Sequence, residues 1–292
     1  MIFKKTMCLL LFYVNPDAKT GELYLILASV RDEIYNRPTK LAEFWENFPN
    51  VIGGRDMEPG KEGGTWLAMS KTGKIAALLN ILQPDEEILP NKKGRGFLVV
   101  DYVADDKDSI SYLKDICSQG EDYNEFFLVT MDYSSRNMPK ICCYSNHYSS
   151  SQPILIEPGV HAFGNSINPL EIYWPKVLEA KKKFSQIING KTSVATKDTL
   201  VEDLFSLLRD NTRYPVDDMM RKQGKGKTRD FLEKLNSIFV SIPGANYGSR
   251  CHTVITIDAE GNVDYFERNR PEILSEVDDQ WVSNNQSFKL LW

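Results

Sequence analysis

The sequence has few cysteines, no long apolar run and no excess of positive charge. Five cysteines among 292 residues are sparse and odd in number, which argues against a disulfide framework and favours a reducing compartment. No apolar stretch approaches the roughly 20 residues that a membrane-spanning helix needs, so we expect no transmembrane span. The formal net charge of −5 argues against the basic stripe of a nucleic-acid-binding surface, so nucleic acid is not an expected partner.

The short motifs of several catalytic centres are missing as well. The chain contains no HExxH, no CxxC pair and no DxDxDG calcium loop, so we predict no catalytic metal. It also lacks the GxSxG elbow of serine hydrolases. A CxxCH motif is absent, so any bound haem would be non-covalent.

The first 14 residues contain two lysines followed by a mostly apolar run. A weak secretory signal has this pattern, but Asn15, Pro16 and Asp17 follow in place of a small-residue cleavage site. A short apolar run before turn residues is more typical of a buried strand. We therefore predict a strand here and a cytoplasmic protein, and the basic, apolar start leaves a mitochondrial fraction open.

The spacing of apolar and turn residues predicts three hairpins, further strands and three helices. The hairpins lie at 8–30, 65–82 and 251–268, the other strands at 126–133, 140–144 and 154–156, and the helices at 106–118, 174–188 and 200–208. The glycine-rich stretch 53–64 is predicted to be a loop, and the polar stretch 211–228 a mobile loop. Strands joined by hairpins form antiparallel sheets that helices must cover, so we predict a layered α+β sandwich as one domain, 1–292.

Cys8 is the first candidate for chemistry because it begins the first predicted strand. In such a hairpin the start of one strand lies opposite the end of the next, so Arg31 and Asp32 are expected beside Cys8. If translation started at Met7 and that methionine were removed, Cys8 would hold a thiol nucleophile and a free α-amine as general base. A cation would favour the thiolate and a carboxylate would orient the amine. The alternative is a buried small side chain beside an ordinary ion pair.

Four blocks of the sequence, in order, resemble the transport and Golgi organisation protein 2 family, also called the NRDE family. These blocks are residues 25–45, 56–80, 93–96 (KGRG) and 247–268. The resemblance covers nearly the whole chain. It implies a four-layer αββα sandwich like that of the N-terminal nucleophile hydrolases, with two packed antiparallel sheets and helices outside, which agrees with the layers inferred above.

Some positions depart from the family pattern. Val30 replaces the asparagine of the NRDE motif, and Cys251-His252 stand where relatives usually have Thr-Asn. Residues 1–6 form an extension where the family typically starts Met-Cys. If this extension is retained, Cys8 has an amide in place of a free amine, and catalysis of the N-terminal type fails.

Asn165 lies in the segment AFGNS, which resembles a family segment. In hydrolases of the wider class an asparagine there helps to bind the oxyanion. The alternative is a turn residue after a strand. The residues that would serve a hydrolase are Cys8, Arg31, Asp32 and Asn165.

The resemblance implies haem movement, lipid or acyl-CoA metabolism, or organisation of the secretory pathway, without an established hydrolase activity. The animal members most like this chain are associated with haem mobilisation. The leading hypothesis is therefore a non-enzymatic chaperone that carries haem b from stores or mitochondria to apo-haemoprotein acceptors. The alternatives are an amidase or thioesterase that uses Cys8, and a protein that handles acyl-CoA or lipid in mitochondria or the secretory pathway.

Haem or an acyl-CoA-like anion would need an apolar cleft and cations for its acidic groups. The candidate cations lie in or near loops that the hairpin ends should bring together; they are Arg31, Arg37, Lys61 and Arg95. The alternative is that these charged side chains are only solvated at the surface. Of the three histidines, His161 and His252 are candidate iron ligands, although ordinary hydrogen-bonded histidines are more common. The candidate ligand-binding residues are Arg31, Asp32, Glu33, Arg37, Lys61, Arg95, His161 and His252.

Overall fold

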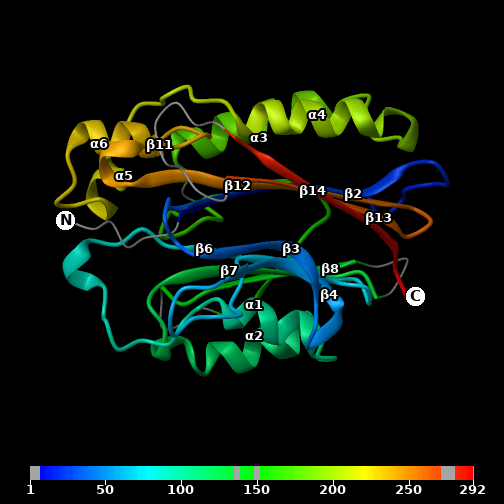
Figure 1. The fold of residues 1–292 in the computed structure, drawn as a ribbon, viewed down its shortest axis with the longest axis horizontal. Helices are drawn as coiled ribbons and strands as arrows, with labels where there is room; N and C mark the ends of the chain where they lie inside the picture. Colours follow the sequence, from blue (N-terminus) through cyan, green and yellow to red (C-terminus); the bar gives the residue numbers. More distant parts are fainter. Residues whose placement is uncertain (1–6, 135–138, 148–151, 172, 271–279, 292) are drawn as a thin grey trace.

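Two antiparallel β-sheets pack face to face at the centre of the structure, and helices cover the outer face of each sheet (Figure 1). The computed structural model describes residues 7–134, 139–147, 152–171, 173–270 and 280–291. The predicted α+β sandwich with layers in the order αββα is confirmed. The expected extension at residues 1–6 lies outside the described residues.

The first sheet contains strands from both ends of the chain. In the described residues its order is β10 (Gly159–Phe163), β1 (Met7–Val14), β2 (Leu23–Ile34), β12 (Tyr247–Asp258), β13 (Asn262–Asn269) and β14 (Val282–Lys289), with β11 (Ser241–Ile242) paired to β12. The helices that cover it are α3 (Pro175–Ile188), α4 (Lys197–Leu208), α5 (Asp218–Gln223) and α6 (Arg229–Leu235).

The second sheet is built from the middle of the chain. Its strands follow the order β3 (Thr39–Trp45), β4 (Phe48–Asp56), β5 (Leu67–Ser70), β6 (Lys74–Asn80), β7 (Phe126–Asp132), β8 (Lys140–Ser145) and β9 (Ile154–Ile156). It is covered by α1 (Phe97–Ala104) and α2 (Ser109–Cys117). Short 3-10 helices lie at η1 (Asp85–Glu87), η2 (Gly120–Asp122), η3 (Val194–Thr196) and η4 (Pro243–Ala245).

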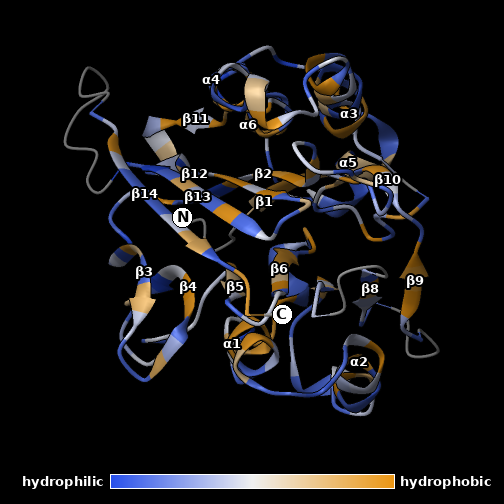
Figure 2. Ribbon diagram, turned by 90° about the vertical axis from the view of Figure 1, so that its right-hand side faces the viewer, coloured by the Kyte–Doolittle hydropathy of each residue, from blue (hydrophilic) through white to orange (hydrophobic). Residues whose placement is uncertain are grey.

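Strand β1 illustrates how the core forms. Leu9 and Leu11 belong to the apolar cluster beneath the helices of the first sheet, whereas Leu10 and Phe12 belong to the cluster between the sheets. Successive side chains of a strand point to opposite faces, and here both faces are covered. This double burial explains why β1 and the first half of β2 are apolar, and apolar residues accordingly gather on the strands between the helix layers (Figure 2).

The stretch 53–64 is only partly a loop, so the prediction is wrong at its start. Strand β4 includes Gly53 and Gly54. A Cβ atom on Gly53 would lie 2.7 Å from the carbonyl oxygen of Leu67, and one on Gly54 would lie 2.7 Å from the ring of Trp66. These two glycines therefore allow close packing against β4, a role that glycine can have inside a strand.

The region 211–228 is not a continuous loop either. Helix α5 lies within it and begins after Asp217, whose side chain accepts a hydrogen bond of 2.7 Å from the Met220 N–H. Met220 and Gln223 are buried. The prediction of a loop is therefore wrong over α5, because the polar composition concealed a helix cap and two buried side chains.

Candidate functional site

Cys8 and Arg31 are direct neighbours across the first two strands. In the antiparallel pairing of β1 with β2, Cys8 lies opposite Arg31 and Met7 lies opposite Asp32. The structure therefore places Cys8 beside these two residues, as the hairpin predicts. The side chains of Arg31 and Asp32 nevertheless separate, since neighbouring residues of a strand point to opposite faces.

The Arg31 side chain points between the two sheets. Its guanidinium carbon lies 4.1 Å from the centre of the Trp66 ring, and its Nη2 lies 3.2 Å from Glu33 Oε2. Arg37 lies 3.5 Å from the same Glu33 oxygen and donates hydrogen bonds to both carboxylate oxygens of Asp56. Arg31 and Glu33 are at most 3% exposed, so this pair is internal, whereas Arg37 and Asp56 at the end of the network are each 15% exposed.

Asp32 is buried on the opposite face of the sheet. The Ser249 hydroxyl donates a hydrogen bond of 2.6 Å to Asp32 Oδ1, and the Tyr247 hydroxyl donates one of 3.3 Å to the Asp32 carbonyl. Burial raises the pKa of Asp32 to about 6, against the opposing effects of the Lys176 charge and the Ser249 hydrogen bond. Lys176, only 1% exposed, donates to the Leu235 carbonyl over 2.8 Å, and burial lowers its pKa.

Cys8 itself is buried, with 4% of its surface exposed. Burial, followed by the charge of Asp32, raises the pKa of its thiol to about 12, although Arg31 and Lys176 act in the other direction. Its main-chain N–H donates a hydrogen bond of 3.1 Å to Asn165 Oδ1. In a chain that retains Met7 this nitrogen is an amide, so Cys8 then combines a protonated thiol with the absence of an amine base.

Asn165 follows β10 and joins Cys8 to two other segments. Its Nδ2 donates a hydrogen bond of 2.7 Å to the Asn80 carbonyl, and its own carbonyl accepts one of 3.0 Å from Gln223 Nε2. Asn165 thus contacts Cys8, with which the sequence grouped it as a residue that would serve a hydrolase. In this arrangement Asn165 fixes the position of the Cys8 backbone.

Arg95 lies in the loop before α1, close to the Cys8 site. Its Nη1 donates a hydrogen bond of 2.6 Å to the Glu125 carbonyl. Burial lowers its pKa to about 10, and the charges of Cys8 and Glu33 oppose that shift. Lys61 is exposed in the neighbouring loop, where its Cγ would lie 4.0 Å from a Cβ atom on Gly94.

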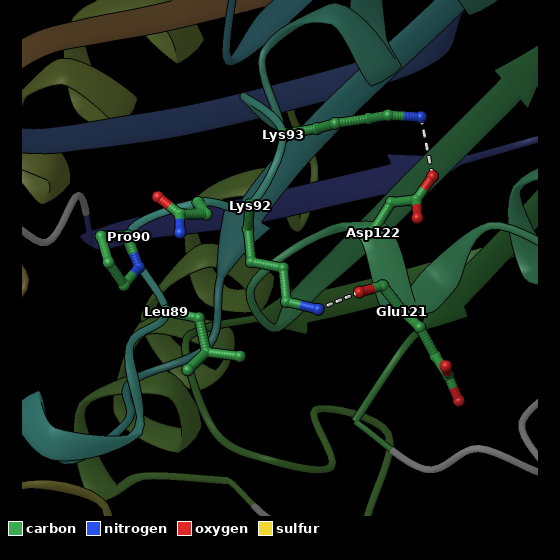
Figure 3. A pocket seen from close by; sticks show the side chains of 7 residues that line it. Leu89, Pro90, Lys92, Lys93, Glu121 and Asp122 are labelled. Atoms are coloured by element: carbon green, nitrogen blue, oxygen red, sulfur yellow. Dashed lines mark hydrogen bonds and ion pairs between the residues drawn. The ribbon is translucent and has the colours of Figure 1, made fainter.

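The surface is hollowed beside this loop (Figure 3). A cavity of about 440 Å³ is lined by Leu89, Pro90, Asn91, Lys92, Lys93, Glu121 and Asp122. Lys93 lies 2.7 Å from Asp122 Oδ2, and Lys92 donates to the Glu121 carbonyl. The lysines of this cavity therefore have partners, and no residue of the predicted site lines it.

The candidate histidines lie far from Cys8 or on the other face of the sheet. His161 is opposite Phe12, four residues along β1, which corresponds to roughly 13 Å. Its Nε2 lies 2.8 Å from the Glu157 carbonyl, and burial lowers its pKa. His252 is fully buried and pairs with Val30, so it shares the helix-covered face. The sequence did not indicate the distance of His161 from Cys8 or the position of His252 on the other face of the sheet.

His252 belongs to a group that we call the arginine–aromatic cluster. This cluster consists of Arg209, Phe239, His252, Arg268, Arg270 and Trp281. The His252 ring centre lies 4.5 Å from that of Trp281, and the guanidinium carbons of Arg209 and Arg270 lie 5.6 and 5.7 Å from the Trp281 ring. Arg268 is the direct cross-strand neighbour of His252. Burial, then the three arginines, lower the pKa of His252 to about 3, so the imidazole is neutral.

Several site residues could not be found from the sequence. Lys176 and Ser249 approach Asp32 from distant parts of the chain, and no motif marks them. Arg209 and Trp281 reach His252 only through the packing of α4 and the segment before β14. Within the described ranges, no three or more His, Cys, Asp or Glu residues are grouped so as to hold a metal ion.

Comparison with known proteins places these observations in a family. The model of the family described as Transport and Golgi organisation 2 matches residues 7–272. The mouse Transport and Golgi organization 2 homolog is 37% identical over 285 residues, which cover 97% of this chain and 99% of the relative. The human homolog is 36% identical, and its alignment covers the same shares of this chain and of the relative. Transport and Golgi organization protein 2 of Drosophila melanogaster is 33% identical, covering 89% of this chain and 91% of the relative.

Two solved structures resemble the chain more distantly. Both are variants of conjugated bile acid hydrolase from Clostridium perfringens, each 11% identical, with TM-scores of 0.40 and 0.35. The alignments cover 97% of this chain and 97% and 96% of the hydrolase chains.

Among the described residues, no helix has both the length and the apolar character needed to cross a membrane.

Proposed function

Because the chain belongs to the transport and Golgi organisation 2 family, we propose that it is a non-enzymatic haem-binding chaperone that carries haem from stores or mitochondria to acceptor haemoproteins. The observation that carries the proposal is the arginine–aromatic cluster. Haem combines a planar apolar macrocycle with two propionates, so it needs aromatic contacts and cations together. The cluster supplies Phe239 and Trp281 for the macrocycle, and Arg209 and Arg268 for the two propionates.

The arginine–aromatic cluster suits this ligand better than the predicted cradle of Arg31 and Arg37. Arg31 is 3% exposed and paired with the buried Glu33, and removing one partner of such a pair leaves an uncompensated charge inside the protein. Arg268 is paired with Glu202, whose side chain is 66% exposed. A surface pair of this kind contributes about 0–1 kcal/mol, so a propionate can replace the Glu202 carboxylate.

The state of Cys8 also supports binding over turnover. Its thiol has a pKa of about 12, and the thiolate is the form that attacks an acyl group. Its nitrogen is an amide that donates to Asn165.

We place the exchange of haem in the cytoplasm, with part of the protein at mitochondria or the secretory pathway.

The test is a titration of the full chain with haemin, followed by absorbance in the Soret region and by transfer to an apo-haemoprotein. We expect saturable binding, and we expect the double variant Arg209→Gln/Arg268→Gln to bind haemin at least about tenfold more weakly, since one charge-assisted hydrogen bond contributes about 1.5–3 kcal/mol. The matched control is Arg221→Gln/Arg229→Gln, which changes two exposed arginines of α5 and α6. Non-saturable binding by the wild type would refute the function. Displacement of haemin by a tighter-binding acyl-CoA would reassign the cluster to acyl-CoA.

A second candidate function is an amidase or thioesterase with Cys8 as nucleophile. The favouring observation is the hydrogen bond from the Cys8 nitrogen to Asn165, which would hold a free α-amine equally well after removal of residues 1–7. That amine would take the thiol proton, and the sulfur would attack the substrate carbonyl. The acyl group would form a thioester with Cys8 while the proton leaves with the amine or thiol product, and water would then release the acid.

The mass of the native protein decides between the two functions. Catalysis of this type requires a chain that begins at Cys8, with a mass lower by residues 1–7. We expect the measured mass of the native protein to match a chain that retains Met7. A chain beginning at Cys8 that hydrolyses an acyl substrate, and loses this activity in the Cys8→Ala variant, would establish the hydrolase instead.

A further inference from the structure

Within the proposed haem complex, on which this inference rests, we propose that His252 is the axial ligand of the iron. The first observation is that neither ring nitrogen of His252 has a hydrogen-bond partner, although its side chain is 0% exposed. Buried polar groups are normally hydrogen-bonded, so such an exception needs an explanation. Coordination of a metal would satisfy one of these two nitrogens.

His252 differs in this respect from the other histidine that the sequence singled out. His161 Nε2 already faces the Glu157 carbonyl at 2.8 Å, and its ring packs 5.1 Å from the ring of Phe12. To bind iron, His161 would have to give up that hydrogen bond. His252 would give up no hydrogen bond, because none involves its ring within the described residues.

The surroundings of His252 select haem over a free metal ion. Within the described part of the chain, His252 belongs to no group of three or more His, Cys, Asp or Glu residues that could hold a free metal ion. A porphyrin brings four of its own nitrogens, so the protein has to supply only one ligand. The adjacent side chains match the rest of that molecule, since Trp281 and Phe239 lie 4.5 and 6.0 Å from His252 between ring centres, and Arg268 pairs across the strands.

The protonation state of His252 agrees with this role. Iron binds the neutral imidazole, whose lone pair is free. Burial and the charges of Arg209, Arg268 and Arg270 keep the ring unprotonated at neutral pH. The side chain that has to move is Trp281, which is half-buried above His252.

A pair of porphyrins tests the assignment. The full chain is titrated with haemin and with metal-free protoporphyrin IX, alongside the His252→Phe variant and the control His147→Gln. We expect His252→Phe to weaken haemin binding by roughly tenfold or more and to leave the affinity for protoporphyrin unchanged, since only haemin can bond to the imidazole. His147→Gln should bind both porphyrins as the wild type does.

Two further measurements test the assignment, and the first uses only the wild-type protein, so it does not depend on the folding of a variant. Pulsed electron paramagnetic resonance of wild-type protein labelled with 15N-histidine should give a 15N coupling to the haem iron. Imidazole added to His252→Gly should restore the wild-type Soret spectrum. Haemin binding without the 15N coupling, or equal haemin affinity in His252→Phe, would overturn this assignment and leave the chaperone function standing. Absence of haemin binding by the wild type would overturn both.

Discussion

At the scale of single residues, the fold holds His252 neutral and this has a consequence for stability. Its pKa is about 3 in the folded protein and about 6.5 in an unfolded chain. Below pH 6.5 the unfolded chain therefore binds a proton that the folded protein does not bind. The free energy of unfolding falls as the pH decreases from 6.5 towards 3, and the loss at pH 5 is about 2 kcal/mol.

The contribution of His252 can be isolated with the His252→Phe variant, which has no titrating group at this position. Urea denaturation of both proteins at pH 7.5 and pH 5 gives the comparison. We expect the wild type to lose about 2 kcal/mol more than the variant between these pH values. Equal losses would mean that the His252 pKa is close to its ordinary value in the folded protein.

The buried pair of Arg31 and Glu33 permits a second prediction for single residues. Arg31→Leu removes the cation nearest to the Glu33 carboxylate, which is 1% exposed and keeps Arg37 at 3.5 Å. We expect the free energy of unfolding to fall by about 3–5 kcal/mol, the usual effect of breaking a buried pair. The double variant Arg31→Leu/Glu33→Gln should recover much of this loss in urea denaturation, because it also removes the buried charge that Arg31 had neutralised. A double variant as unstable as Arg31→Leu would instead assign the loss to packing against Trp66.

At the scale of the elements, the sequence predicted hairpins well because their signals are local. The apolar runs and the turn at Gly73 define the β5–β6 hairpin, and Gly73 has the positive φ of 92° that such a turn requires. The hairpin of β3 and β4 was missed, since Thr39–Trp45 is half polar and has a register shift against β4. Helix α1 was also missed because its sequence FLVVDYVA is mostly apolar and has no helical period.

Helix α2 was predicted from its period, and its start depends on one side chain. Asp108 accepts hydrogen bonds from the N–H groups of Ile110 and Ser111, at 3.0 and 3.2 Å. We expect Asp108→Ala to lower the free energy of unfolding by about 1 kcal/mol, because two N–H groups lose their acceptor. Urea denaturation measures this loss, and Asp106→Ala in the preceding loop serves as the control. Equal stability of the two variants would exclude the capping role.

At the scale of the whole molecule, the sequence predicted the proximity of Cys8 to Arg31 but not the arrangement around His252. The first contact depends on one hairpin, whose register follows from the length of its loop. The second requires α4, β12, β13 and the segment before β14 to meet on one face of the sheet. Nothing local in the sequence specifies such a meeting, because it results from the packing of a helix layer on strands from both ends of the chain.

The shared core between the sheets predicts that both sheets unfold together. Leu27 of the first sheet and Ile75 of the second are fully buried in the same apolar cluster. We expect Leu27→Ala and Ile75→Ala each to lower the free energy of unfolding by about 2–5 kcal/mol, with a single transition seen by far-ultraviolet circular dichroism and by tryptophan fluorescence. Val282→Ala, at a side chain that is 41% exposed on β14, should change stability little. If Leu27→Ala produced two separate transitions, the sheets would be independent units, and the core between them would contribute little to their mutual stability.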